Sequence, residues 1–146
     1  MKVLFKYSDS DGVDIFFGVR NRGDVRRAIG VECRVFPRTE FSDNSTDAFG
    51  GSIAKVWYDA DDNACGIQLY YPAAEFYFSE KQFLGVGLGE AELFLSDQGV
   101  AFDCEDDNTG ISIKGGAVRF YAPNADELGN AAIIEAVYVE IPRLEH

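Results

Sequence analysis

Histidine is nearly absent from this chain of 146 residues, and its one copy, His146, is the last residue. The ending Leu144-Glu145-His146 is typical of an expression-tag remnant, so we leave residues 144–146 out of the fold reasoning. Without His146, the Ser-His-Asp and Cys-His arrangements of nucleophilic catalysis have no base. We therefore expect no catalytic residue of this kind.

Cysteine is also scarce, with three copies at Cys33, Cys65 and Cys104. An odd number at wide spacing fits neither a disulfide framework nor a zinc pattern. Buried thiols are the simplest interpretation, because free cysteine behaves as a small apolar residue.

Motifs for phosphate or metal binding are missing as well. The glycines of Gly85-Val86-Gly87-Leu88-Gly89 lack the spacing of a phosphate-binding loop, and a loop before a helix explains them. The run from Asp59 to Asn63 imitates the start of a calcium loop. It has Ala64 at the sixth position and Tyr70 at the twelfth, where glycine and a bidentate acid belong. We expect no metal, no cofactor and no enzymatic activity.

No apolar run approaches the roughly 20 residues of a membrane span. The first residues, MKVLFKYSDSDG, become polar too early for a signal peptide, which predicts a cytoplasmic protein. Basic residues are few: 13 Lys and Arg face 25 Asp and Glu, for a formal net charge of −12. Such a charge opposes nucleic-acid binding and favours a basic partner, whose approach it would steer.

Hydrophobic residues make up 47% of the chain, which predicts one folded domain over residues 1–143. Alternating and helical periodicities predict an α+β fold of antiparallel sheets with two short helices. We predict strands at 3–7, 13–19, 31–36, 53–58, 66–71, 75–78, 100–104, 111–113, 118–121 and 131–141, and helices at 21–30 and 88–98. Asp24 or Asn21 would cap the first helix, and Gly30 would end it. The stretch 38–51 is predicted to be loop because it lacks periodicity.

The segments 53–58 and 66–71 flank an acidic turn and predict a central hairpin. Alternation of side chains places Val56, Ile67 and Leu69 on the core face. The other face carries Lys55, Trp57, Gln68 and Tyr70. A mixed aromatic and polar face either packs under a helix or loop, or binds a partner. Elsewhere, Arg20, Arg22, Arg26 and Arg27 form a basic patch, which is either a solvated helix face or a contact site for an acidic group.

An internal repeat is suggested at about 13–80 and 81–142. Phe16-Phe17-Gly18-Val19, a helix and a strand are matched by Phe83-Leu84-Gly85-Val86, a helix and a strand. Each half would be a helix followed by an antiparallel meander, and the halves would join either edge to edge or face to face.

Several segments carry a resemblance to known proteins: DVRRAIG at 24–30, FSDNSTDAFG at 41–50, VWYD at 56–59, GI at 66–67 with PAAEF at 72–76, GI at 110–111 and YAP at 121–123. They resemble small bacterial cytoplasmic proteins of the immunity type, found near secreted polymorphic toxins. The helix-plus-meander duplication is also similar to β-lactamase-inhibitor-like domains, which bind proteins through an open sheet face. This chain departs from those domains in lacking a secretion signal and disulfide pairs.

Charge and resemblance together predict a non-catalytic protein-binding module that neutralises a basic toxin, without nucleic-acid or membrane binding. Its candidate partner-binding residues are Trp57 and Tyr70 as anchors, with Asp59, Asp61, Asp62, Glu105, Asp106 and Asp107 in acidic loops. Two alternatives stay open at this point. One is a small ligand-binding domain or enzyme, and the other is a structural homo-oligomer, such as a homodimer formed through a sheet edge.

Overall fold

The computed structural model describes residues 2–40, 42–105 and 109–144, and it has the predicted α+β fold. Its larger sheet has the strand order β3-β4-β5-β6-β12-β11-β10-β9, and its smaller sheet has the order β2-β1-β7-β8. The larger sheet consists of β3 (Cys33–Phe36), β4 (Thr46–Phe49), β5 (Ala54–Tyr58), β6 (Ala64–Tyr70), β9 (Asp103–Cys104), β10 (Gly110–Ile113), β11 (Val118–Tyr121) and β12 (Ala136–Glu140). The smaller sheet consists of β1 (Val3–Ser8), β2 (Gly12–Val13), β7 (Ala74–Phe78) and β8 (Lys81–Gln82).

The larger sheet is made of two antiparallel meanders that join edge to edge. Strands β3 to β6 pair in chain order, as do β9 to β12, and β6 pairs antiparallel with β12 at the centre. In the smaller sheet, β1 and β7 pair in parallel, and each forms a hairpin with the short strand after it. The order of a hairpin, a helix and four strands thus occurs twice along the chain, first from β1 to β6 and then from β7 to β12. A duplication of the sequence itself stays a prediction.

The two predicted helices are present, as α1 (Arg22–Ile29) and α2 (Leu88–Asp97). Asn21 caps α1 by accepting a hydrogen bond from the Gly23 amide, and Gly30 ends it in the left-handed conformation at φ 73°. A third helix, α3 (Ala125–Leu128), precedes β12. No helix in the described ranges has the length and apolar character to cross a membrane.

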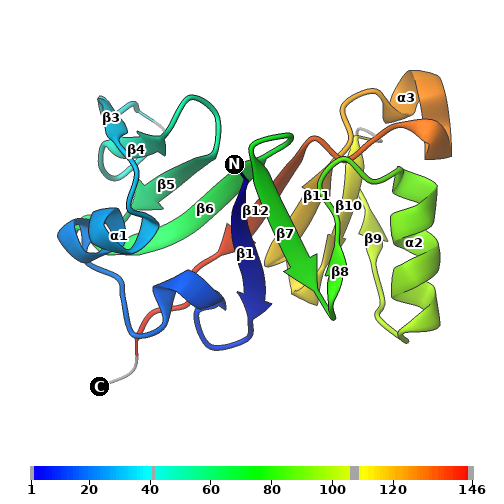
Figure 1. Ribbon diagram of the computed structural model, residues 1–146, viewed down its shortest axis with the longest axis horizontal. Coiled ribbons are helices and arrows are strands. Elements are labelled where there is room, and N and C mark those ends of the chain that lie inside the picture. The colour runs from blue at the N-terminus through cyan, green and yellow to red at the C-terminus, as the bar shows by residue number, and fades with distance from the viewer. Residues whose placement is uncertain (1, 41, 106–108, 145–146) are drawn as a thin grey trace.

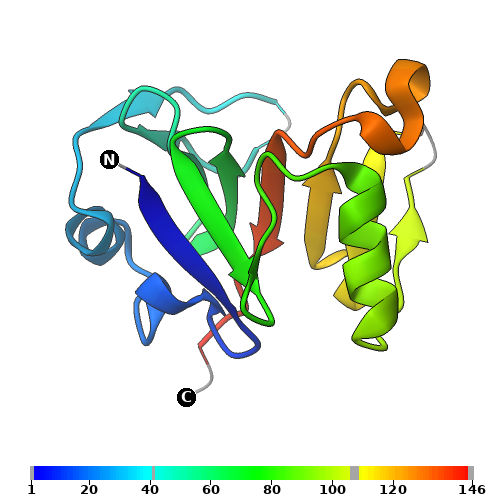
Figure 2. The ribbon, with the colours of Figure 1, turned by 45° about the vertical axis from the view of Figure 1, so that its right-hand side comes forward.

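The core lies between the two sheets. Phe5 and Phe76 of the smaller sheet and Phe120 of the larger are fully buried there, with Phe76 and Phe120 packed edge to face at 6.1 Å between ring centroids. Phe83, just after β8, stacks on Phe120 at 4.8 Å and contacts Phe94 of α2. The smaller sheet and both longer helices therefore cover the same face of the larger sheet, as Figures 1 and 2 show.

Four predicted segments differ from the structure. The strand predicted at 100–104 is limited to β9 at Asp103–Cys104. The strand predicted at 13–19 stops at Val13, where a 3-10 helix, η1 (Asp14–Phe16), begins. The loop predicted at 38–51 contains β4, because pairing with β3 and β5 stabilises a polar segment that shows no periodicity. The strand predicted at 131–141 is shorter, since residues 129–131 form a 3-10 turn, η3 (Gly129–Ala131), after α3.

The predicted basic patch is a set of internal contacts. Arg20 is 5% exposed and pairs with Asp11, and Arg22 and Arg26 both pair with the fully buried Asp47 of β4. Arg27 forms an ion pair with Asp24 on the exposed side of α1. Three of the four arginines thus hold local structure together, and their charges are compensated within the chain.

Candidate functional site

One face of the larger sheet is covered by none of the described helices. Val56, Ile67 and Leu69 point to the covered face and are fully buried, as predicted. Lys55, Trp57, Gln68 and Tyr70 alternate with core positions along β5 and β6 and are only partly buried. We call the face that carries them the outer face. No helix among the described residues covers this face, and its role as a binding surface stays a prediction.

A row of directly paired residues crosses the middle of the outer face. Lys55 lies opposite Gln68, and Gln68 lies opposite Tyr138 of β12. Tyr138 in turn lies opposite Arg119 of β11. At the β3 edge, Arg34 and Ala48 extend the row to Lys55. The row therefore brings three cations, Arg34, Lys55 and Arg119, onto one surface of an acidic protein.

Aromatic rings lie beside this row. The rings of Trp57 and Tyr138 contact edge to face with 5.8 Å between centroids. The Lys55 ammonium lies 5.2 Å from the Trp57 ring centroid and 5.3 Å from that of Phe36. Both distances are in the range of cation–π attraction. Tyr138 lies over Gly66, where a Cβ atom would overlap its phenol oxygen. The pair Trp57–Tyr138 thus packs against Lys55 and Gly66 and is a candidate anchor.

Two phenols and one thiol on or beside the outer face have raised pKa values, which favours their neutral forms. Burial raises the pKa of the Tyr138 phenol, with further contributions from nearby acidic groups, and burial alone raises the pKa of Tyr70. Burial also raises the pKa of the Cys65 thiol, and Asp59 and Asp43 add to this effect. A protonated thiol is a poor nucleophile. These groups are suited to packing and hydrogen bonding rather than to attack on a substrate.

The turn between β5 and β6 holds three of the predicted acidic residues. An Asp59 carboxylate oxygen, Oδ1, accepts hydrogen bonds from the amides of Asp61 and Asn63 and so shapes the turn. Asp61 is exposed, whereas Asp62 accepts hydrogen bonds from Arg22 and Asn44. Asp59 and Asp61 line an open groove of about 530 Å³ with Asp43, Asn63, Cys65, Arg20 and Arg143. Asp59 and Asp62 thus each have Oδ1 engaged within the chain, Asp62 also in an ion pair with Arg22, and Asp61 is exposed.

The other predicted acidic residues lie elsewhere. The Glu105 amide donates a hydrogen bond to the Gly110 carbonyl oxygen. Gly110 is in one row of paired residues with Tyr121, Ala136 and Tyr70, so Glu105 lies at the Tyr70 end of the larger sheet. The β5–β6 turn is at the opposite end of the sheet, beside Trp57. Asp106 and Asp107 lie outside the described residues. The predicted candidates are thus divided between the two ends of the larger sheet, and they do not form one cluster.

Four residues of the outer face were missed as site candidates: Phe36, Lys55, Arg119 and Tyr138. Alternation with the buried Val137 and Val139 was a signal for Tyr138, since it places that side chain on the face opposite the core. Its contact with Trp57 depends on the pairing of β6 with β12, strands that are far apart in the chain. No local pattern encodes that register.

Within the described ranges, no three His, Cys, Asp or Glu side chains are grouped so that they could hold a metal ion. A scan against protein-family models matches no family, and searches of curated proteins and solved structures find no match. The resemblance to immunity-type proteins therefore stays a prediction from the sequence motifs.

Proposed function

We propose that this protein is a non-catalytic binding module whose outer face docks onto a basic protein partner. The observation that carries the proposal is the Trp57–Tyr138 ring contact, which lies near the β5–β6 turn on a sheet face that no described helix covers. Binding energy in protein interfaces concentrates in a few aromatic side chains of this kind. The immunity-type resemblance makes a nuclease-type toxin the specific partner class that we favour.

The charge distribution supports a basic partner. With a formal net charge of −12, the protein attracts cationic surfaces over distances of about 8–10 Å at moderate salt. Asp59 and Asp61, next to the Trp57 end of the outer face, would meet lysine and arginine side chains or mimic a phosphate backbone. The acidic groups would then set the rate of association, and the aromatic pair would set the lifetime of the complex.

The test is capture of the partner from the source cells, followed by binding measurements with the purified, identified protein. We expect the partner to be basic and its association rate to fall as salt rises. Trp57→Ala should weaken the complex by at least about tenfold, because a hot-spot aromatic is removed. Asp59→Asn combined with Asp61→Asn should slow association while leaving dissociation nearly unchanged.

Two matched controls remove similar groups away from the outer face. Phe17, 82% exposed next to η1, is the control for Trp57, and Phe17→Ala should leave binding unchanged. Asp126→Asn combined with Glu127→Gln removes two exposed charges on α3 and should have a smaller effect on association. An acidic partner, or equal losses in Trp57→Ala and Phe17→Ala, would contradict the proposal.

A further inference from the structure

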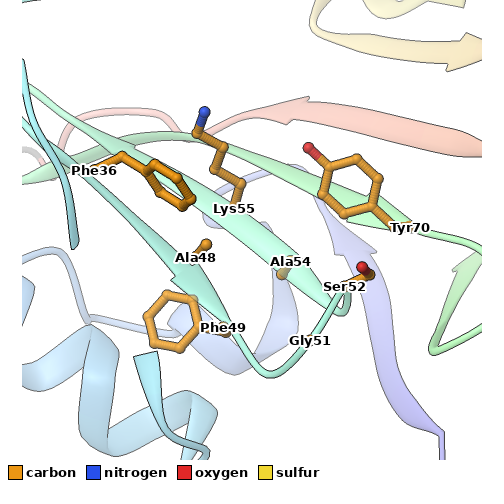
Figure 3. Close-up of a pocket in the computed structure, with 8 residues that line it drawn as sticks. All are labelled: Phe36, Ala48, Phe49, Gly51, Ser52, Ala54, Lys55 and Tyr70. Atoms are coloured by element: carbon orange, nitrogen blue, oxygen red, sulfur yellow. The ribbon is translucent and has the colours of Figure 1, made fainter. Parts of the chain in front are cut away.

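An open groove of about 230 Å³ lies at the β3 side of the outer face. Figure 3 shows its residues on β3 to β6 and the turn between β4 and β5: Phe36, Ala48, Phe49, Gly51, Ser52, Ala54, Lys55 and Tyr70. The lining is mixed, with apolar surface from Phe36, Ala48 and Ala54 and polar groups from the Lys55 ammonium and the hydroxyl groups of Ser52 and Tyr70. In the described part of the chain, none of these three groups has a hydrogen-bond partner.

Lys55 is a cation without a carboxylate. Arg20, Arg22 and Arg26 all pair with acidic side chains on the covered side of the sheet. Among the described residues, no acidic oxygen lies within 4 Å of the Lys55 ammonium, although the chain has 25 Asp and Glu. The ammonium lies within cation–π range of the rings of Phe36 and Trp57. A cation that lacks a carboxylate within the described chain can pair with an incoming anion without breaking an existing ion pair.

The net charge of the protein and the lining of the groove favour a peptide carboxylate over a nucleic-acid phosphate as the bound anion. A nucleic acid would bring one phosphate per nucleotide towards a protein of net charge −12, and that repulsion grows with each phosphate. A single carboxylate on an apolar peptide segment carries one negative charge and is therefore repelled much less than a chain of phosphates. The apolar surfaces of Phe36, Ala48 and Ala54 suit the side chain next to that carboxylate.

We propose that this groove receives an acidic residue of the protein partner, with its carboxylate on Lys55 and an apolar neighbour against Phe36 and Tyr70. This inference rests on the proposed function, because the acidic residue belongs to the same partner. The outer face is then bipolar. Cations of the partner meet Asp59 and Asp61 at one end, and a carboxylate meets Lys55 on the β3 side of Trp57, so the partner binds in one orientation.

The groove can be tested without the partner by titrating isotope-labelled protein with capped peptides and following amide NMR shifts. The probes are acetyl-Leu-Glu-Phe-Glu-Leu-amide, its glutamine analogue and its lysine analogue. We expect saturable shifts at amides of residues 36, 48–55 and 70 with the glutamate peptide, and about fivefold weaker binding of the glutamine peptide. Lys55→Gln should remove that difference. Lys2→Gln, which removes an exposed lysine without an ion pair among the described residues, should preserve it.

Equal binding of the three peptides, or shifts confined to another surface, would overturn the carboxylate assignment. Stronger binding of a short oligothymidylate at the same amides would overturn it in favour of a nucleic acid. The outcome is separable from the proposed function. If Trp57→Ala weakens binding of the basic partner while Lys55→Gln leaves it unchanged, the protein-binding role stands and the groove assignment fails. If Lys55→Gln weakens binding of the partner while Trp57→Ala leaves it unchanged, the groove assignment stands and the aromatic anchor of the proposed function fails.

Discussion

The phenol of Tyr58 donates a hydrogen bond of 3.0 Å to Oδ2 of Asp47, and both side chains are buried against α1. Asp47 also accepts hydrogen bonds from Arg26 at 2.8 Å and from Arg22 at 3.0 Å. The Arg22 guanidinium lies over the Tyr58 ring, 4.0 Å from its centroid. One buried carboxylate thus joins β4, β5 and α1 behind the outer face.

Asp47→Asn should destabilise the fold by about 3 kcal/mol, because it leaves two arginines without their shared buried countercharge. Urea unfolding followed by circular dichroism measures the change. Asp24→Asn is the matched control, since it breaks an exposed ion pair with Arg27 on the same helix and should cost less than about 1 kcal/mol. Similar losses in the two variants would mean that Asp47 is not the carboxylate on which the junction depends.

Stability should fall in acid through the same carboxylate. Burial alone would raise the pKa of Asp47, but the hydrogen bonds from Arg26 and Tyr58 and the charges of both arginines outweigh it and lower that pKa. The folded state therefore gains stability from ionised Asp47 above the unfolded-state pKa of about 3.9. It loses that stability as the pH falls through the lower folded-state value. Urea midpoints from neutral to acidic pH should drop less steeply for Asp47→Asn, and parallel curves would contradict this assignment.

Gly66→Ala should disturb the aromatic pair of the outer face. An added Cβ atom would lie 2.8 Å from two ring carbons of Tyr138 and overlap its hydroxyl group, so the ring must move. Trp57 is the one tryptophan of the chain, and its emission should shift to longer wavelength as Tyr138 withdraws. Tyr138→Ala should give the same shift, and Tyr138→Phe, which keeps the ring, should not. An unchanged spectrum in Gly66→Ala would show that the ring contact tolerates the methyl group.

Gly110→Ala should destabilise the fold strongly. A Cβ atom there would overlap the backbone carbonyl oxygen of Phe120 on the neighbouring strand and lie 3.0 Å from its carbonyl carbon. Backbone atoms of the β10–β11 ladder cannot move aside as a flexible side chain can, so we expect a loss of about 3 kcal/mol or more in thermal or urea unfolding. Gly51→Ala is the control, because nothing lies within 4 Å of the added methyl group and its φ is not in the left-handed range. Equal stability of the two variants would be the contrary result.

The local elements were predictable where a periodic pattern decides them. The stripe Leu88, Ala91 and Leu95 is buried on α2, as the helical spacing predicted, and Gly30 ends α1. Prediction failed where pairing outweighs propensity. Thr46 and Asp47 look like loop residues, yet β4 forms because strands on both sides satisfy its backbone and two arginines neutralise its carboxylate.

The candidate site divides in the same way. Alternation along β5 and β6 was enough to place Lys55, Trp57, Gln68 and Tyr70 on a shared face. The alternation pattern does not indicate whether a helix covers that face, or which side chains from distant strands also lie on it. It also grouped acidic loops that the sheet holds at opposite ends, with Asp59 near Trp57 and Glu105 near the Tyr70 end.

The sequence alone determined the fold class, the acidic charge, the central hairpin and the inward side chains of its strands, because these depend on composition and on spacing along the chain. Only the tertiary structure decided that the two meanders meet through β6 and β12, and that Tyr138 therefore reaches Trp57. It also decided that Arg22 and Arg26 form ion pairs with Asp47, while Lys55 has no carboxylate partner among the described residues. Those outcomes depend on which distant segments pair and in what register, and the free energy that selects the register comes from burying the whole core at once.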